Sequence, residues 1–326
     1  MRRRDFITGI VPVLAATRVV GQSSDKPSAP LADYHQHLFS PALIALTSST
    51  PPVSQATTVA ANDLIAILDT ARIPRAVVLS TAYIFTQPSR NVANDYEKVR
   101  ADNDWTAREV AKFPDRLIGF CGINPLKDYA VDEIARCART PELRRGIKFH
   151  FGNSTVDYHN SQHVEQLRRV FRVANDLGMA IVVHMRSSTT LRLPYGRDEA
   201  TVFFKEVLSA APDVSVQVAH LSGGGGYADP TIDPALQVFT EAIARKDPTV
   251  RNLWFDVSGV VSAATTEPQA TLITTRIREL GVQRILYGTD GLGINSARDG
   301  WNEFLKLPLT IAEFRTIANN TPPFMS

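Results

Sequence analysis

Two kinds of hydrophobic pattern alternate along the chain. Short apolar runs are followed by longer segments in which apolar residues recur at every third or fourth position. The short runs are continuously apolar, as parallel strands covered on both faces are, and the longer segments have the period of amphipathic helices. We predict eight strands: one that begins at Leu31, then Ala76–Ser80, Leu117–Ile123, Gly146–His150, Ala180–His184, Val214–His220, Leu253–Val257 and Arg284–Gly288.

Helical segments follow the strands, and several end at a glycine or proline that turns the chain toward the next strand. A long loop that forms part of a lid is expected after the first strand, over Ser40–Ala61, which is rich in Ser, Thr, Pro and Ala. We predict helices over Asp63–Arg72, Asn103–Phe113, Val131–Arg139, Ser161–Leu177, Asp198–Ala210, Pro234–Arg245 and Pro268–Leu280, with helical structure over Asp299–Ala318.

This alternation predicts an α/β fold, a single-domain (β/α)8 TIM barrel with C-terminal helices that occupies residues 29–326. The alternative is an open doubly wound sheet, whose ligands gather at one crevice. Polar residues instead mark the ends of the first, fourth, fifth, sixth and eighth strands, as a closed ring of strands would display them.

The N-terminus predicts an export signal and linker over residues 1–28. A positive segment is followed by a weakly apolar run to about Ala16 and then by Gly, Ser and Pro. The order Arg3-Arg4-Asp5-Phe6-Ile7 resembles a twin-arginine signal, which would direct a folded protein to the periplasm or beyond, with cleavage near Val19–Gly21. The alternative is a disordered basic tail on a cytoplasmic protein.

Composition limits the classes of partner that we expect for this protein. With 326 residues, 44% of them hydrophobic, the chain can bury one large core, and Lys+Arg 35 against Asp+Glu 33 leaves no clustered positive face for nucleic acid. No run of about 20 apolar residues predicts a membrane span. Cys121 and Cys137 lie in a strand pattern and a helix pattern, which indicates buried free thiols. We expect a small-molecule substrate as the partner, and the sequence leaves homo-oligomer formation open.

Histidines close several of the predicted strands. His35 and His37 lie at the exit of the first strand, where the two-residue repeat places both side chains on one side, about 6 to 7 Å apart along the backbone. The ends of later strands carry His150, His184, His220 and Asp290. In a barrel these ends meet at one mouth, so we predict a shared site there.

Taken together, these motifs resemble the amidohydrolase superfamily, and within it the branch that includes aminocarboxymuconate semialdehyde decarboxylase. The resemblance rests on Asp33-Tyr-His-Gln-His, on the histidines that close the fifth and sixth strands, and on Tyr287-Gly-Thr-Asp at the eighth. Further matches are Gly119-Phe-Cys-Gly-Ile-Asn-Pro-Leu, Gly146-Ile-Lys-Phe-His, Ala219-His-Leu-Ser-Gly-Gly, Phe255-Asp-Val-Ser-Gly and Ile317-Ala-Asn-Asn, so the similarity spans nearly the whole chain after the N-terminal segment.

The resemblance implies roles for particular residues. One divalent metal ion would be held by His35, His37, His184 and Asp290, with water or hydroxide completing its coordination. Asp290 would take a proton from that water and pass it to the leaving group, and His220 would hydrogen-bond the hydroxide or polarise the substrate carbonyl. Lys148, His150 and Arg186 are expected to contact substrate. Lys148 lies where some members of the superfamily carry a bridging lysine between two metals, and a second metal is the minor alternative.

Ligand chemistry supports the same site independently. Three imidazoles and a carboxylate suit zinc or another first-row ion such as manganese, and an open coordination position marks a catalytic rather than a structural site. The glycine run that follows Ser222 lacks the spacing of a phosphate-binding loop, so we interpret it as a flexible loop that permits close approach at the site.

We therefore expect a metal-dependent hydrolase that directs a metal-activated hydroxide at an ester, lactone or amide of a small organic acid. The first alternative is a metal-dependent decarboxylase of an unsaturated or aromatic acid, in which Arg186, Arg192 or Arg197 would grip the carboxylate. The second alternative is a metal-binding barrel without catalytic activity.

Overall fold

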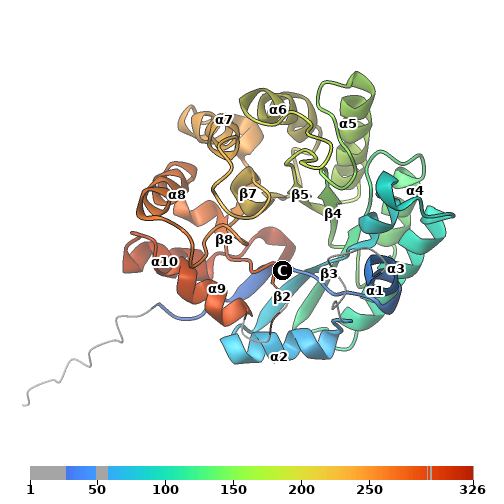
Figure 1. The fold of residues 1–326 in the computed structure, drawn as a ribbon, viewed down its shortest axis with the longest axis horizontal. Helices are drawn as coiled ribbons and strands as arrows, with labels where there is room; N and C mark the ends of the chain where they lie inside the picture. The colour runs from blue at the N-terminus through green and yellow to red at the C-terminus, as the bar shows by residue number, and fades with distance from the viewer. Residues whose placement is uncertain (1–26, 49–57, 292, 294–295, 326) are drawn as a thin grey trace, which may run out of the picture.

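Eight parallel strands hydrogen-bond in chain order from the first to the last, as the alternating pattern predicts. The computed structural model describes residues 27–48, 58–291, 293 and 296–325 (Figure 1). Its strands are β1 (Ala32–Gln36), β2 (Arg75–Leu79), β3 (Leu117–Gly122), β4 (Gly146–His150), β5 (Ala180–His184), β6 (Val216–Val218), β7 (Leu253–Asp256) and β8 (Ile285–Leu286). The N–H of Tyr34 donates to the carbonyl of Tyr287 at 2.9 Å, and the N–H of Asp290 donates to the carbonyl of His35 at 2.9 Å. These bonds join the last strand to the first, so the prediction of a (β/α)8 barrel is confirmed.

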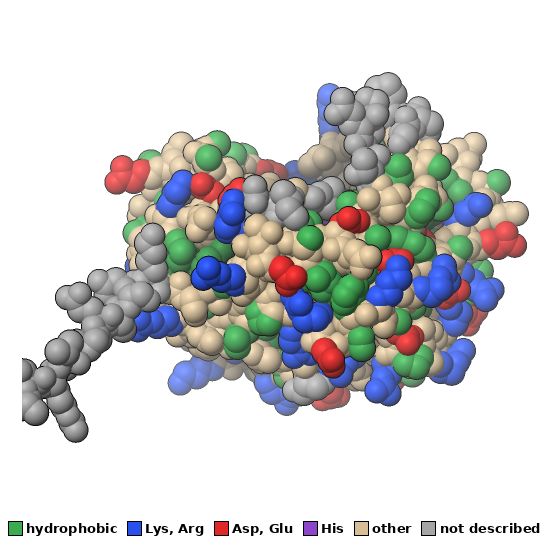
Figure 2. All heavy atoms as spheres, turned by 90° about the horizontal axis from the view of Figure 1, so that it is seen from below, with side chains coloured by type: hydrophobic (Ala, Val, Ile, Leu, Met, Phe, Trp, Pro, Cys, Tyr) green, Lys and Arg blue, Asp and Glu red, His purple; other side chains and the backbone are tan. Residues whose placement is uncertain are grey.

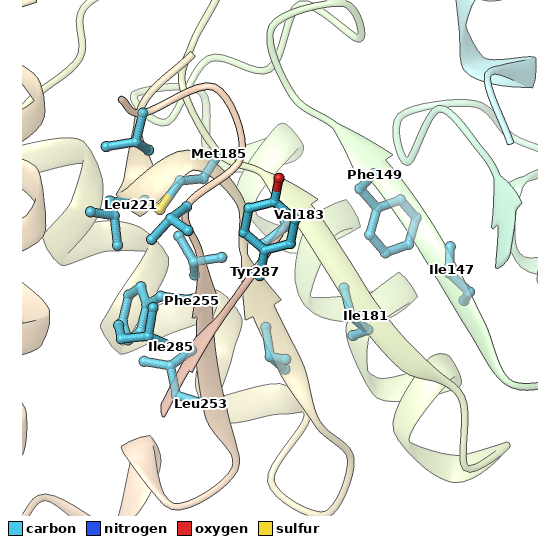
Figure 3. Packing of buried hydrophobic residues seen from close by; sticks show 14 of the residues in the cluster. Ile147, Phe149, Ile181, Val183, Met185, Leu221, Leu253, Phe255, Ile285 and Tyr287 are labelled. Carbon is cyan, nitrogen blue, oxygen red and sulfur yellow. The ribbon is translucent and has the colours of Figure 1, made fainter. Parts of the chain in front are cut away.

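Both faces of the strands are buried, which explains their continuous apolar runs. One set of side chains, including Phe149 and Val183, packs outward against the helices, with the ring of Phe149 5.7 Å from that of Phe171 (Figure 3). The alternate set fills the barrel, where Phe120 packs against Phe324 near the C-terminus at 5.3 Å between ring centroids. The inner face is therefore a packed core up to the level of the polar strand ends.

Helices surround the strands on the outside of the ring (Figure 1). Two of the expected helix ends lie at glycines with left-handed backbone, Gly178 with φ 69° and Gly281 with φ 89°, a conformation that costs glycine little. The helices are α1 (Pro41–Ser48), α2 (Ala61–Ala71), α3 (Asp95–Val110), α4 (Ala130–Ala138), α5 (Ser161–Asp176), α6 (Arg197–Val202), α7 (Ile232–Ala244), α8 (Glu267–Leu280), α9 (Ser296–Phe304) and α10 (Ile311–Asn319).

Four predicted segments differ from the structure. The helix expected over Asp198–Ala210 is an α-helix over Arg197–Val202, then a π-helix over Phe203–Val207 and a 3-10 helix over Leu208–Ala210. The expected loop over Ser40–Ala61 contains α1, because Ser40 Oγ accepts the N–H of Leu43 at 3.1 Å and Leu43 is buried; residues 49–57 of the expected lid lie outside the described residues. Helix α3 begins eight residues before Asn103. The C-terminal helical stretch is broken before Thr310, whose hydroxyl caps α10 by accepting the N–H of Glu313 at 3.2 Å.

The outer surface carries mixed charge. On the face shown in Figure 2, acidic and basic side chains are interspersed rather than gathered into a patch of one sign. No helix in the described ranges combines the length and apolarity needed to cross a bilayer. The predicted export signal and linker lies outside the described residues, apart from residues 27 and 28.

Candidate metal centre

The predicted site residues lie at the carboxyl ends of the strands. His184 ends β5, His220 follows β6, and Asp290 follows β8. The register between β1 and β2 shifts between Asp33 and Gln36, a bulge of the kind that redirects a side chain near an active site. The rings of His35 and His37 lie 5.2 Å apart, which agrees with the predicted proximity of this pair.

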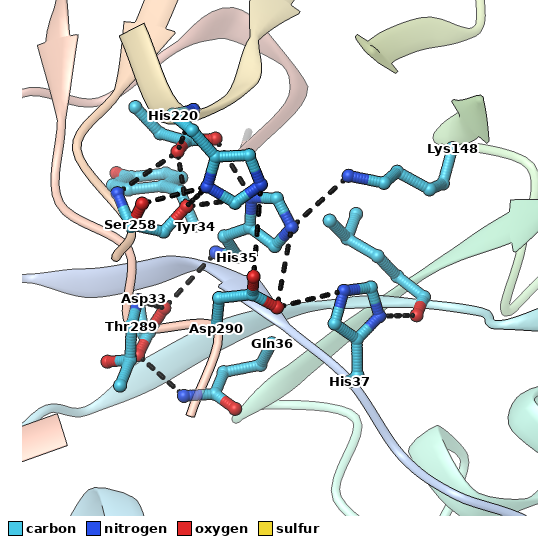
Figure 4. A network of polar contacts seen from close by, with 12 residues as sticks. Asp33, Tyr34, His35, Gln36, His37, Lys148, His220, Ser258, Thr289 and Asp290 are labelled. Atoms are coloured by element: carbon cyan, nitrogen blue, oxygen red, sulfur yellow. Dashed lines mark hydrogen bonds and ion pairs between the residues drawn. The ribbon is translucent and has the colours of Figure 1, made fainter. Parts of the chain in front are cut away.

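Asp290 lies among three histidines (Figure 4). Its Oδ1 is 3.3 Å from His37 Nε2 and 3.9 Å from His35 Nε2, and its Oδ2 is 3.8 Å from His220 Nε2. His35, His37 and Asp290 each offer a ligand atom within 4.8 Å of the others, which is close enough for the three to share one ion. One carboxylate oxygen thus faces the two histidines of β1, and the other faces His220.

Hydrogen bonds orient the histidine rings in the same sense. The Nδ1–H of His35 donates to Asp256 at 3.0 Å, that of His37 to the carbonyl of Leu79 at 2.7 Å, and that of His220 to the carbonyl of Ser258 at 2.8 Å. Each ring therefore keeps the lone pair of Nε2 for the interior of the site. This tautomer and this type of partner are typical of metal-ligating histidines, so the donor set fits a divalent ion.

Asp256, at the end of β7, is a positioning residue that the sequence analysis gave no role. It contacts the ring of His35 and accepts the backbone N–H of His220 at 3.0 Å. Burial alone would raise the pKa of Asp256, but the His35 ring and the His220 N–H hold it below its usual value. A polar residue that closes an apolar strand is the same signal that identified the histidines, and it was available here in Phe255-Asp-Val-Ser-Gly.

The backbone has strained, left-handed conformations at His220 and the two residues after it, and at Asp290. His220, Leu221 and Ser222 have φ of 55°, 47° and 68°, and Asp290 has φ of 56°. Such conformations cost non-glycine residues about 1–3 kcal/mol each and persist where the surroundings impose them. Here the hydrogen bonds to the N–H groups of His220 and Asp290 hold both residues, which directs their side chains into the site.

His184 lies next to this group rather than inside it. Its ring centroid is 5.1 Å from that of His220, and it is stacked on His150 at 3.8 Å. Burial, followed by the neighbouring histidines, lowers the pKa of His184 well below its usual value, which favours the neutral ring that a metal requires. His150 accepts the N–H of Asn153 at Nδ1, so its neutral ring carries a proton on Nε2. Tyr83, also buried, lies 5.2 Å from the His150 ring and was missed because no strand end marks it.

Lys148 is a buried cation at the same site. Its Nζ is 3.2 Å from His35 Nε2, the nitrogen that is left free by the bond to Asp256. Burial lowers the pKa of Lys148 to about 8, while the carboxylates of Asp290 and Asp256 oppose that shift. Nε2 of His35 has a single lone pair, so Lys148 and a metal ion would compete for it, and binding of the ion would displace this contact.

Arg186 is committed to other protein groups. Its Nε and one terminal nitrogen contact Asp229 Oδ2 at 3.0 and 2.9 Å, and its other terminal nitrogen donates to the carbonyl of Ser187 at 3.2 Å. The guanidinium also lies 4.9 Å from the ring centre of Tyr195. Arg186, which we expected to contact substrate, therefore has its positive charge balanced by Asp229.

A cleft of about 320 Å³ opens beside the site, and both Arg186 and Asp229 line it. His150 and His184 form its inner wall. Gly224 lies across from them, and a Cβ added there would lie 3.6 Å from His184, so the glycine loop approaches the ring as the sequence analysis expects. His184 lines the cleft and contacts His220, and so links the cleft to the histidine group.

The model of the Amidohydrolase family matches residues 32–322. The chain belongs to the amidohydrolase family. It is therefore an enzyme, and the resemblance drawn from its motifs is confirmed. No curated protein matches the sequence.

Solved structures share the fold of this amidohydrolase at low identity. The 5-carboxyvanillate decarboxylase of Sphingomonas paucimobilis is 16% identical, with a TM-score of 0.63 over 89% of this chain and 97% of its own. A dihydroxybenzoic acid decarboxylase of Polaromonas, solved with manganese and 2-nitroresorcinol, is 16% identical, with a TM-score of 0.60 over 90% and 95%. A probable 2-pyrone-4,6-dicarboxylic acid hydrolase of Acinetobacter baumannii is 17% identical, with a TM-score of 0.55 over 88% and 96%.

Proposed function

We propose that this amidohydrolase is a metal-dependent hydrolase of an ester, lactone or amide, and that one divalent ion is held by His35, His37, His184 and Asp290. The oriented Nε2 atoms of His35 and His37, together with Asp290 Oδ1, support the first three ligands. His184 is the fourth because it lies at the wall between this group and the cleft. The donor set favours zinc, and the manganese in the Polaromonas decarboxylase makes that ion the alternative.

The proposal rests on the Asp290 carboxylate, whose two oxygens face different groups of the site. When bound, the ion lowers the pKa of a coordinated water and polarises the substrate carbonyl. Asp290 Oδ1 faces the ligand histidines, while Oδ2 faces His220, so the second oxygen is placed to accept a proton and deliver it to the leaving group. His220, with its proton on Nδ1, accepts a hydrogen bond at Nε2 and so orients the attacking water.

Hydrolysis is favoured over decarboxylation by the charge of the cleft. A decarboxylase needs a cation to hold the carboxylate that leaves as carbon dioxide, and Arg186 is the cation that lines the described part of the cleft. Its charge is balanced by Asp229 at 2.9 Å. A neutral ester, lactone or amide requires no such cation.

Decarboxylation is the second candidate because of Lys148. This buried ammonium, 3.2 Å from His35 Nε2, would adjoin a carboxylate held at the ion. The fold is also shared with several decarboxylases, although at 15–18% identity this supports the fold alone.

A product assay separates the two reactions. The metal-loaded enzyme is incubated with a panel of lactones, esters, amides and hydroxybenzoates, and acid release and carbon dioxide release are measured in the same samples. Hydrolysis predicts acid release without carbon dioxide. Carbon dioxide from a hydroxybenzoate, with no acid from any ester, lactone or amide, would replace the hydrolase proposal with the decarboxylase.

The fourth ligand is tested by metal content. We expect His184→Ala, like His37→Ala and Asp290→Ala, to lower the metal bound per chain after dialysis, measured by plasma mass spectrometry, which also identifies zinc or manganese. His220→Ala should retain metal and lose turnover, because His220 acts on the water rather than on the ion. Metal loss in His220→Ala with full metal in His184→Ala would assign the fourth position to His220.

We also propose that the protein is exported through the twin-arginine pathway to the periplasm or beyond. The N-terminal order of Arg3-Arg4, an apolar run and a Pro-rich linker supports this. Full-length protein expressed in its host should fractionate with the periplasm, and Arg3→Lys combined with Arg4→Lys should retain it in the cytoplasm. Equal cytoplasmic retention of both forms would contradict export.

A further inference from the structure

Tyr83 is a buried tyrosine whose hydroxyl is left without a partner. Its side chain is 3% exposed, and no residue that the structure describes hydrogen-bonds the hydroxyl. The oxygen is not one of the fully enclosed unpaired polar atoms of the described residues, so it borders open space although the ring is buried. Buried tyrosine hydroxyls usually have a hydrogen-bond partner, so an accessible unpaired one indicates a partner from outside the chain.

The segment that carries Tyr83 is held in place after β2. It forms a short 3-10 helix over Ala82–Thr86. The hydroxyl of Thr86 donates to the carbonyl of Tyr83 at 2.6 Å and accepts the side-chain N–H of Asn124 at 3.0 Å. Phe85 of the same turn is buried in an apolar cluster with residues of α1 and α3. Because these contacts fix the backbone, little ordering of Tyr83 is required when a ligand binds.

Three aromatic rings connect Tyr83 to the candidate metal centre. The Tyr83 ring lies 5.2 Å from the ring of His150, which is stacked at 3.8 Å on His184, its register partner in the β4–β5 pair. Burial, followed by the charges of Asp290 and Asp102, raises the pKa of Tyr83 well above its usual value. The phenol is therefore within electrostatic reach of Asp290 and remains protonated, so its role is that of a hydrogen-bond donor.

His150 supplies a second donor beside Tyr83. Its Nδ1 accepts the N–H of Asn153 at 3.2 Å, so the neutral ring carries its proton on Nε2. Within the described part of the chain, this Nε2–H has no partner. His150 also lines the cleft beside the site, so a ligand there can reach it. An O–H and an N–H, both uncharged and both unused, thus lie next to each other at the wall of the site.

We propose that Tyr83 is a further catalytic residue, and that its hydroxyl and the Nε2–H of His150 donate hydrogen bonds to the substrate carbonyl oxygen as that oxygen becomes negatively charged. The inference rests on the proposed hydrolase function and adds a residue to it. Donors that are already in position stabilise such a charge without any reorganisation during the reaction.

The reaction balances without proton transfer from either donor. As the water oxygen adds to the carbonyl carbon, one water proton passes to Asp290 and the π electron pair of the carbonyl moves onto its oxygen. When the bond to the leaving group breaks, this pair re-forms the carbonyl and Asp290 returns the proton to the leaving group. Tyr83 and His150 keep their protons throughout, and their hydrogen bonds are strongest while the oxygen is charged.

A tetrahedral anion tests the donors without turnover. Methylphosphonate carries its charge on oxygens around a tetrahedral centre, as the reacting carbon does after attack, and it is titrated calorimetrically into the metal-loaded enzyme. Tyr83→Phe should weaken its binding about ten- to a hundredfold, the equivalent of one hydrogen bond to a charged group, with the metal content per chain unchanged. Equal binding by Tyr83→Phe, or no binding by the parent enzyme, would overturn the inference.

Matched variants locate the effect. Tyr96→Phe removes a hydroxyl from α3, where the ring stacks on Tyr129 at 4.2 Å, and should leave the affinity unchanged. His150→Phe keeps an aromatic ring against His184, removes the Nε2–H and should weaken methylphosphonate by a similar factor, which keeps the inference testable even if Tyr83→Phe does not fold. Because both donors contact one oxygen, the double variant should depart from the product of the two factors by at least about threefold. Two independent factors would contradict a shared oxygen.

A turnover measurement separates failure of this inference from failure of the proposed function. With an ester, lactone or amide that the enzyme hydrolyses in the product assay, Tyr83→Phe should lower kcat about 100-fold and change KM less than about threefold, because the contact strengthens as charge develops. An unchanged kcat would refute the role of Tyr83 and leave the hydrolase intact. Hydrolysis of no member of the panel, with methylphosphonate binding still dependent on Tyr83, would refute the hydrolase and leave the donor pair intact.

Discussion

Asp256 accepts hydrogen bonds from the ring of His35 and from the backbone of His220, and so controls two histidines at once. In Asp256→Asn the negative charge is lost and the His35 tautomer is no longer enforced. We expect metal affinity to fall about 10–100-fold, the usual effect of removing such a supporting carboxylate. Competition with a chromogenic chelator measures the change, and Asp213→Asn, at an exposed position, is the control. Unaltered affinity would show that Asp256 does not position His35.

Asp102 is a second buried carboxyl, remote from the proposed ligands in sequence. Burial raises its pKa to about 6, although hydrogen bonds from Ser40 and Thr81 lower it in part. Between about pH 4 and 6 the native state therefore binds more protons than the unfolded state, so this group makes the free energy of unfolding fall as pH rises through that window.

This pH dependence predicts the stability of Asp102→Asn, because the asparagine side chain carries no charge at any pH. The variant should be more stable than the parent at pH 7.5, by about 1–3 kcal/mol, because it avoids burying an anion. The advantage should largely vanish near about pH 3, where Asp102 is mostly protonated in both states. Urea unfolding at both pH values measures it, and a stability difference that does not depend on pH would contradict the pKa assignment.

At the scale of elements, closure of the barrel depends on the approach of the β8 segment to β1. A Cβ added at Gly288 would lie 2.8 Å from the Cβ of His35, closer than packed atoms allow, and 3.1 Å from that of Ser258, which is a tight contact. This glycine therefore permits the contact that brings Asp290 next to the histidines of β1.

Gly288→Ala is expected to lower the free energy of unfolding by about 1–3 kcal/mol, the usual cost of overpacking, and to weaken metal binding because Asp290 moves away from His37. Thermal unfolding and chelator competition measure the two effects. Gly293→Ala is the matched control, since a Cβ there meets no atom of the described residues within 4 Å. Full metal affinity in Gly288→Ala would show that the strand contact does not position Asp290.

At the scale of the whole molecule, the C-terminal segment packs into the core at one end of the barrel and the candidate metal centre lies at the other. Phe324 and Met325 pack into the inner core with Tyr34 and Phe120, at the end where Arg75 and Arg145 donate to the carbonyls of the C-terminal segment. The histidines lie at the other end, where the strands finish.

Phe324→Ala should therefore destabilise the enzyme by about 3–5 kcal/mol, the range for removing a core phenylalanine, while metal affinity per folded chain stays unchanged. Denaturant unfolding measures the first quantity and chelator competition below the transition measures the second. A large loss of metal affinity in the folded variant would show that the two ends are coupled.

Much of the fold follows from local pattern. Continuous apolar runs predict all eight strands because parallel strands are buried on both faces, and the stops at Gly178 and Gly281 follow from the conformational freedom of glycine. The helix α1 was missed because its stability comes from Ser40 and from the burial of Leu43, neither of which produces a periodic signal over eight residues.

By itself, the sequence determined which strands carry histidines and that His35, His37 and Asp290 belong to one end of one barrel, because strand ends in a barrel share a mouth. Only the tertiary structure decided that Asp256 holds His35, that Asp229 balances Arg186 and that His150 and His184 line one cleft. These pairings join residues from different strands and loops, and their distances depend on how the barrel closes rather than on any local pattern.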